Sequence, residues 1–100
     1  MHHYQTKLLP TVENDLDEII NYYTINVGVH IAAQFLDEFE QQLQTLKRDP
    51  FFQTRYNEVR CLAVGKFPFL IHYTADEKDK MVWIHGVIHT SRNPTDKWIY

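Results

Sequence analysis

The sequence has little cysteine, little glycine and no long apolar run: it holds one Cys and three Gly in 100 residues. Because Cys61 is the only cysteine, no disulfide can form within the chain, which favours a reducing, cytoplasmic setting. No apolar stretch approaches the roughly 18 residues of a membrane span, and residues 1–10 lack the apolar centre of a signal peptide. The sequence therefore predicts a cytoplasmic protein with no membrane partner.

Basic side chains are also scarce. The formal net charge is -3 and the pI is ≈ 6.0. Residues 1–50 hold three basic and eight acidic side chains (net -5), whereas residues 51–100 hold seven and five (net +2). A general nucleic-acid binder needs a cation for each phosphate it contacts. Strong direct binding to nucleic acid is therefore not expected, and a small basic site is possible only in the second half.

The residues that are present are those of an ordinary globular protein, with 44% hydrophobic and 23% charged side chains. This length suits one domain spanning residues 1–100. Loose alternation over residues 3–9 predicts a short strand, and Thr11 is a plausible helix N-cap. Helical spacing then predicts a helix over residues 12–26, ended by Gly28; its apolar positions are Val12, Leu16, Ile19, Ile20 and Tyr23.

A second apolar stripe predicts another helix, which ends at Lys47-Arg48 before Asp49-Pro50. Its positions are Ala32, Phe35, Leu36, Phe39, Leu43 and Leu46. Since the turn between the helices is short, they must fold back as an antiparallel hairpin and lay a shared apolar face on the rest of the chain.

Three stretches rich in β-branched and aromatic residues follow, at residues 58–64, 67–75 and 81–90. Gly65-Lys66 and the polar residues 76–80 separate them and are typical of hairpin connections. The order strand, helix, helix and three strands predicts an α+β fold of the type β-α-α-β-β-β.

The last two predicted strands are apolar on both faces. One face of the first strand carries Phe67, Phe69, Ile71 and Tyr73, and the other face carries Leu70. One face of the second strand carries Val82, Ile84 and Ile88, and the other carries Met81, Trp83 and Val87. A sheet with helices on one side only should alternate apolar with polar residues. The second face therefore needs a cover, which is the Trp98 tail, a partner chain, or both.

The C-terminal stretch ends the last strand, since Pro94 cannot donate a hydrogen bond to the ladder. Folding back of residues 96–100 would let Trp98 anchor the tail. The alternative is that Trp98 stays exposed as a binding hot spot, where Trp is enriched.

Other candidate sites have simpler interpretations. His85 and His89 lie about 13 Å apart on a strand, so with His72 they are expected to be core or surface residues and no metal is expected. Asp15, Asp17 and Glu18 are expected to be a solvated helix start rather than paired catalytic carboxylates. A lone Cys61 within a strand is expected to be a packing residue.

Four stretches taken in order resemble the RelE/ParE superfamily of toxins from bacterial type II toxin-antitoxin modules, also labelled plasmid stabilisation proteins. They are DLDEIINYY, AAQFLDEFEQQLQTL, VRCLAVGKFPFLIHYTADE and the closing IHGVIHTSRNPTDKW. The strand that ends in His-x-x-Arg-x-Pro-x-x-x-Trp is similar to the ParE-type branch in particular.

The resemblance implies a helical hairpin packed on a twisted, mainly antiparallel sheet, with no cofactor. It implies an antitoxin partner, often disordered until it wraps the toxin. A homodimer is the other expectation if an apolar face of the sheet is left uncovered. Two activities are known in the superfamily: ParE-like members poison DNA gyrase, and RelE-like members cut messenger RNA on the ribosome.

Cutting RNA needs a base, an acid and cations around the reacting phosphate. Arg92 sits where RelE-like members carry an arginine after the last strand, but their third-strand arginine is replaced by an apolar residue at about Phe69. Trp98 falls near the position of the terminal aromatic acid, and an indole is a poor proton donor. A nuclease would therefore have to rely on Arg92 and Arg60, and enzymatic activity is not favoured.

The basic residues Arg60, Lys66 and Arg92 have two interpretations of equal weight. They are solvated or paired with Glu58 and Asp96, or they face the antitoxin or the target. With Trp98 they form the predicted binding set. Three functions stay open: a ParE-like gyrase poison acting by binding, a ribosome-dependent endoribonuclease, and a non-toxic relative that binds an antitoxin.

Overall fold

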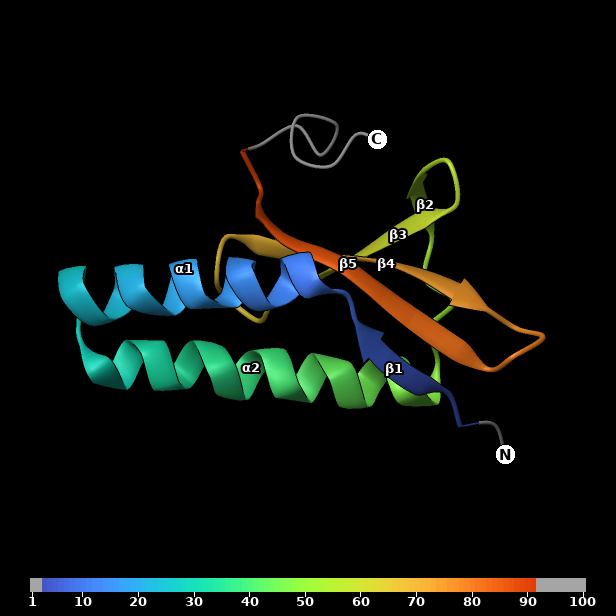
Figure 1. Cartoon of the computed structure of the whole chain (residues 1–100), viewed down its shortest axis with the longest axis horizontal. Coiled ribbons are helices and arrows are strands. Elements are labelled where there is room, and N and C mark those ends of the chain that lie inside the picture. Colours follow the sequence, from blue (N-terminus) through green and yellow to red (C-terminus); the bar gives the residue numbers. More distant parts are fainter. Residues whose placement is uncertain (1–2, 92–100) are drawn as a thin grey trace.

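The computed structural model describes residues 3–91 and contains two helices and five strands (Figure 1). In chain order they are β1 (Gln5–Leu8), α1 (Pro10–Asn26), α2 (Val29–Arg48), β2 (Thr54–Tyr56), β3 (Val59–Ala63), β4 (Phe69–Asp76) and β5 (Met81–His89). Among the residues described, neither helix is long and apolar enough to cross a membrane.

The five strands form one mixed sheet in the order β1-β5-β4-β3-β2. β1 pairs with β5 in parallel, and the other three pairings are antiparallel. The predicted α+β fold is confirmed, and the structure adds β2, which joins β3 through a tight turn. Asn57 in that turn has φ 49, a left-handed conformation that Asn tolerates better than most residues. A strand of three residues is too short to show a period-2 pattern in the sequence.

Helix α1 begins earlier than its apolar stripe predicts. Pro10 occupies the first turn, where its missing N–H is no loss, and Leu9 precedes it in an extended conformation. The prediction that Thr11 is the N-cap is wrong, because its hydroxyl donates to the carbonyl oxygen of His85 at 2.9 Å. The predicted end is confirmed: the helix stops at Asn26, and the N–H of Gly28 bonds to the Tyr23 carbonyl oxygen.

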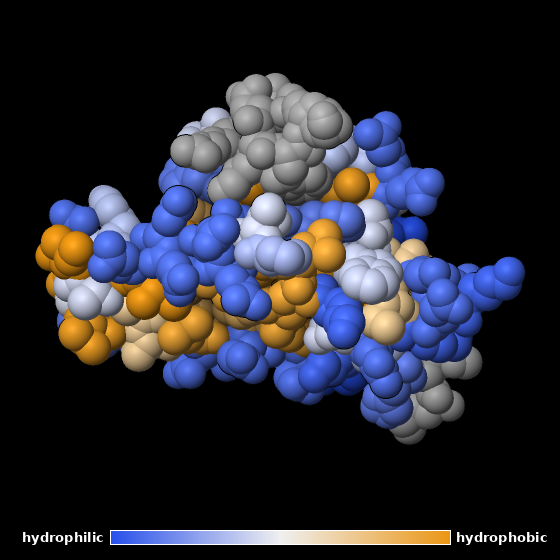
Figure 2. All heavy atoms as spheres, viewed as in Figure 1, coloured by the Kyte–Doolittle hydropathy of each residue, from blue (hydrophilic) through white to orange (hydrophobic). Residues whose placement is uncertain are grey.

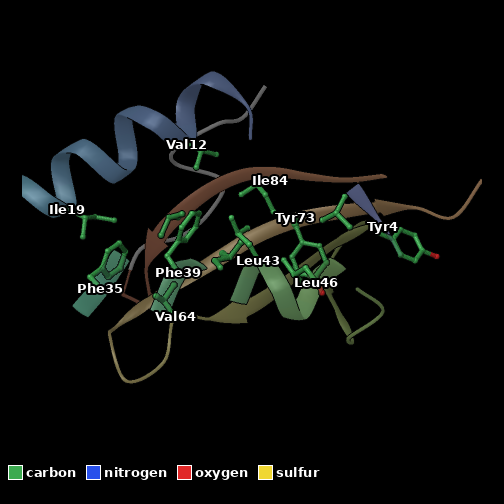
Figure 3. Close-up of a cluster of buried hydrophobic side chains, with 13 residues drawn as sticks. Tyr4, Val12, Ile19, Phe35, Phe39, Leu43, Leu46, Val64, Tyr73 and Ile84 are labelled. Carbon is green, nitrogen blue, oxygen red and sulfur yellow. The ribbon is translucent and has the colours of Figure 1, made fainter. Parts of the chain in front are cut away.

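Helix α2 buries most of its predicted stripe, namely Ala32, Phe35, Phe39, Leu43 and Leu46. Leu36 is the exception, with 39% of its surface exposed, because it lies at the border of the stripe that faces the sheet. Figure 3 shows Val12 and Ile19 from α1, the α2 side chains, and Tyr73 and Ile84 from the sheet meeting in one core. Both helices therefore cover the same face of the sheet.

A β-bulge in β5 changes which side chains reach that core. His72 pairs with Gly86 but Tyr73 pairs with Ile84, so His85 is an extra residue without an opposite partner. The side-chain alternation shifts by one at this point, and Val87 joins the core cluster. The predicted face assignment is therefore wrong at its end: Ile88, not Val87, points to the opposite face.

Candidate functional site

The sheet face opposite the helices carries a row of polar side chains in its centre. Cys61 on β3 is the cross-strand neighbour of His72 on β4, and alternation places Thr74 on the same face. The bulge brings His85 to this row, with its Nε2 2.9 Å from the Thr74 hydroxyl oxygen. Tyr56 on β2 reaches in from the sheet edge. These five residues are called the polar row below.

His72 is the buried centre of the polar row, with only 3% of its surface exposed. Its Nδ1 lies 3.1 Å from the Tyr56 hydroxyl oxygen and 3.4 Å from the Cys61 sulfur. Burial, and secondly the positive charge of Arg55, lowers the pKa of His72 to about 4. The imidazole is therefore neutral at pH 7 and serves as a hydrogen-bonding group.

The neighbours of His72 are also held uncharged. Burial raises the pKa of the Cys61 thiol to about 11, against a smaller opposing effect of Arg55. Burial likewise lowers the pKa of His85. A general acid or base works best with a pKa near the working pH, and a nucleophilic cysteine needs its thiolate. These values suit a structural network, in agreement with the interpretation of Cys61 as a packing residue.

Asp15 has a different role from the predicted solvated helix start. Only 4% of its surface is exposed, and its Oδ2 accepts a 3.0 Å hydrogen bond from the backbone N–H of Val87, two residues after the bulge. Asp17 and Glu18 are exposed, as predicted. A buried Asp needs such a partner, because a buried N–H or carboxylate without one is costly.

A pocket of ≈ 420 Å³ opens beside Asp15, between α1 and the C-terminal end of β5. Its lining combines buried apolar side chains of β5 with the rings of Tyr22 and Phe69 and the exposed Glu18. It is the second place, after the polar row, where side chains of several elements converge.

Comparison with known proteins decides the family. The sequence model of the ParE toxin of the type II toxin-antitoxin system parDE matches residues 6–94. The chain belongs to the ParE toxin family. A search of curated proteins gives no match.

Solved structures with the ParE-family fold include a chain of the chromosomal ParDE toxin-antitoxin system of P. aeruginosa. It is 19% identical, with a TM-score of 0.75 over 89% of this chain and 98% of that chain. A chain of the RelBE2 toxin-antitoxin complex of Mycobacterium tuberculosis is 17% identical, with a TM-score of 0.58 over 87% and 98% of the two chains. The TM-scores show a shared fold, and at these identities they show nothing beyond the fold.

The structure separates the residues that sequence analysis grouped as a binding set. In this ParE fold Arg60 lies near the start of β3, whereas Lys66 is exposed in the turn after the end of that strand. Arg60 donates to the carbonyl oxygen of Phe52, and its guanidinium carbon lies 5.1 Å from the centre of the Phe51 ring. Arg60 therefore holds the loop after α2 against the sheet. Arg92 and Trp98 lie outside the described residues.

Sequence analysis did not identify the roles of two residues near the polar row. Arg55 is exposed on β2, a strand that the sequence does not reveal, yet its charge acts on His72 and Cys61. Asp15 could have been found, because it lies three residues after Val12 and four before Ile19, on the buried stripe of α1.

The histidines do not assemble into a metal centre in the described part of this ParE chain. His72 and His85 belong to the polar row, whereas Nδ1 of the exposed His89 accepts from the Ser91 N–H at 3.1 Å. Across residues 3–91, no group of three or more His, Cys, Asp or Glu side chains is placed to hold an ion.

Proposed function

We propose that this ParE-family toxin acts by binding a protein target, DNA gyrase, and not by chemistry of its own. The polar row carries the proposal. On the sheet face opposite the helices, the pKa values of His72, about 4, and Cys61, about 11, leave uncharged groups at pH 7. Neutral groups of this kind supply neither a cation nor an acid and base for phosphoryl transfer, which favours an activity by binding.

Phe69 supports the same conclusion. At about this position the RelE-like pattern has an arginine, whereas here the ring packs with the core: its centroid lies 5.7 Å from that of Phe35 and 6.4 Å from that of Tyr23. No cation can be supplied to a phosphate from this position. Arg60, the other candidate cation on the strands, is engaged with Phe51 and Phe52.

The alternative is a RelE-like endoribonuclease. The similarity of the fold to the RelBE2 chain, with a TM-score of 0.58, is compatible with this function. It would depend on Arg92 together with Arg60. A third possibility is a relative that binds an antitoxin without being toxic.

One set of assays separates the three. The purified toxin should inhibit gyrase supercoiling or stabilise gyrase-cleaved DNA, and should leave ribosome-bound messenger RNA intact. Messenger cleavage in a translation extract, with gyrase unaffected, would establish the nuclease instead. Inactivity in both assays, with antitoxin binding retained, would identify the non-toxic relative.

A cognate antitoxin is the second part of the proposal. Both similar structures come from toxin-antitoxin systems. The toxin exposes large apolar side chains that a partner could cover: Tyr22, Ile25, Val27, Val29, Leu36, Phe51 and Phe52. We assign Lys66, Arg92 and Trp98 to partner or target contacts and Arg60 to supporting the loop. Lys66→Ala should then weaken binding of the antitoxin or gyrase without altering thermal stability, whereas Arg60→Ala should lower stability.

A further inference from the structure

We propose that the pocket between α1 and the end of β5 binds an arginine side chain of the antitoxin. The proposal rests on the proposed function only in taking the antitoxin as the partner. Figure 1 shows the C-terminal end of β5 rising beside α1, and the pocket of ≈ 420 Å³ lies between them. This volume is at the lower end of ligand pockets and suits one or two side chains of a peptide.

The floor of the pocket is apolar. Ile19 from α1 and Val87 from the helix-facing side of β5 line it, and each is at most 7% exposed. The rings of Tyr22 and Phe69 add to the lining, and Tyr22 is 59% exposed. Such a surface fits a long side chain that buries a methylene stem and keeps its polar end at the rim.

The charge at the pocket is negative. Asp15 and Glu18 line it from α1, one helical turn apart, and the described lining residues include no Lys or Arg. The Asp15 carboxylate already accepts the Val87 N–H, so the exposed Glu18 is the group that a ligand meets at the rim. His89 does not oppose a cation through its Nδ1, which accepts from the Ser91 N–H. A cation is therefore the complementary ligand.

The aromatic lining favours arginine over lysine. A guanidinium is planar, stacks on aromatic faces and is more weakly hydrated than an ammonium, so it loses less on entering a partly apolar site. Glu18 and the Tyr22 ring, four residues apart on one face of α1, could contact the same guanidinium from two sides.

The test uses N-acetyl-arginine methylamide as the probe, added to the full chain while backbone amide NMR signals are recorded. Saturable shifts are expected at Tyr22, Val87 and Ser91. The lysine analogue should bind more weakly, and the citrulline analogue, which has the same shape without the charge, should not bind.

Exposed substitutions then locate the site without endangering the fold. Glu18→Gln should weaken the arginine probe about threefold, the range of an exposed ion pair. Tyr22→Leu should weaken it about threefold through the lost ring contact. Glu13→Gln, an exposed acid on the same helix that does not line the pocket, should leave affinity unchanged.

Several outcomes would overturn the proposal. Equal binding of the citrulline analogue, or no pocket shifts at the solubility limit of the arginine probe, would exclude recognition of a cation. Shifts that appear only in an Arg92→Gln variant would assign the pocket to the chain's own arginine.

The purified toxin-antitoxin complex tests the assignment to the antitoxin. The arginine probe should no longer shift the pocket amides in the complex, and unchanged probe binding there would exclude the antitoxin as occupant. The probe experiment on the isolated toxin needs neither gyrase nor antitoxin. Its failure is therefore distinct from a failure to form the complex or to inhibit gyrase.

Discussion

His72 makes the stability of the toxin depend on pH, and His85, whose pKa is also lowered by burial, adds to this dependence in the same direction. The pKa of His72 is about 4 in the folded chain, against an ordinary value of 6.5. Above pH 6.5 it is neutral in both states; as the pH falls from 6.5 to about 4, the unfolded chain gains a proton that the folded chain resists. The free energy of unfolding should therefore fall over this window, by up to about 3 kcal/mol.

Urea unfolding at several pH values measures this effect. His72→Gln should reduce the loss of stability on acidification, because the amide hydrogen-bonds without titrating. His30→Gln, at an exposed position on α2, should keep the full pH dependence. An unchanged slope in the His72 variant would mean that other groups cause the acid loss.

Asp15 should matter to stability more than its place in an acidic helix suggests. Asp15→Ala leaves the buried Val87 N–H without this acceptor, at a cost of about 1–3 kcal/mol. Asp15→Asn keeps an acceptor oxygen and should cost less. Asp17→Ala, at an exposed site, should change the free energy of unfolding by no more than roughly 0.5 kcal/mol. Denaturant titrations of the three variants give the order, and equal effects of Asp15→Ala and Asp17→Ala would contradict it.

Burial of single polar residues was the part of the site least predictable from sequence. Apolar spacing predicts the buried stripe of α1, and Asp15 lies on that stripe, but its charge favours a solvated position. The pKa of His72 depends on Arg55 and on burial, and neither is visible before β2 and the sheet register are known. Cys61 could be predicted to be a packing residue, because an uncharged thiol within a strand packs like a small apolar side chain and needs no hydrogen-bond partner from another element.

The turn between β3 and β4 depends on glycine at one position. Gly65 has φ +54, and a Cβ there would meet the Glu38 carboxylate of α2. Gly65→Ala should therefore cost about 1–2 kcal/mol from the backbone conformation alone, and more from the contact. Combining it with Glu38→Ala should recover only the contact part, measured by a double-mutant cycle of unfolding free energies. Full recovery would mean that the left-handed backbone costs nothing here.

Helices and long strands followed from sequence because their patterns repeat over several turns or residues. The stripes of α1 and α2 and the runs of β3 to β5 were located to within a few residues. The bulge at His85 was not, since one inserted residue shows only when β5 is aligned with β4. The start of α1 depended on contacts of Thr11 and Leu9 with β5, which no local pattern records.

At the scale of the molecule, the end of the helical hairpin is an uncharged apolar surface. Residues 19–36 contain no Asp, Glu, Lys or Arg. Four exposed side chains, Tyr22, Ile25, Val27 and Val29, form what is here called the hairpin tip. Figure 2 shows hydrophobic residues gathered at this end of the molecule. A patch of this kind marks a contact surface or a tendency to associate.

The isolated toxin should therefore self-associate weakly through the hairpin tip. Ile25→Lys should reduce association in sedimentation equilibrium and change the unfolding free energy by no more than roughly 0.5 kcal/mol, because Ile25 is 71% exposed. Asn21→Lys adds the same charge at an exposed polar position on the same helix and serves as the control. An equal reduction in both variants would point to net charge as the cause.

The parallel pairing of β1 with β5 also determines when the sheet can be completed during synthesis of the chain. Gln5–Leu8 cannot pair until Met81–His89 has been made, and at about 5–20 residues per second that wait lasts roughly 4 to 15 s. During synthesis, Val12 and the other core residues of the helices also lack their contacts with Val82, Ile84 and Val87. A nascent chain that has not passed β5 therefore has no completed sheet, and any activity that needs the complete fold can begin only after β5 has been made.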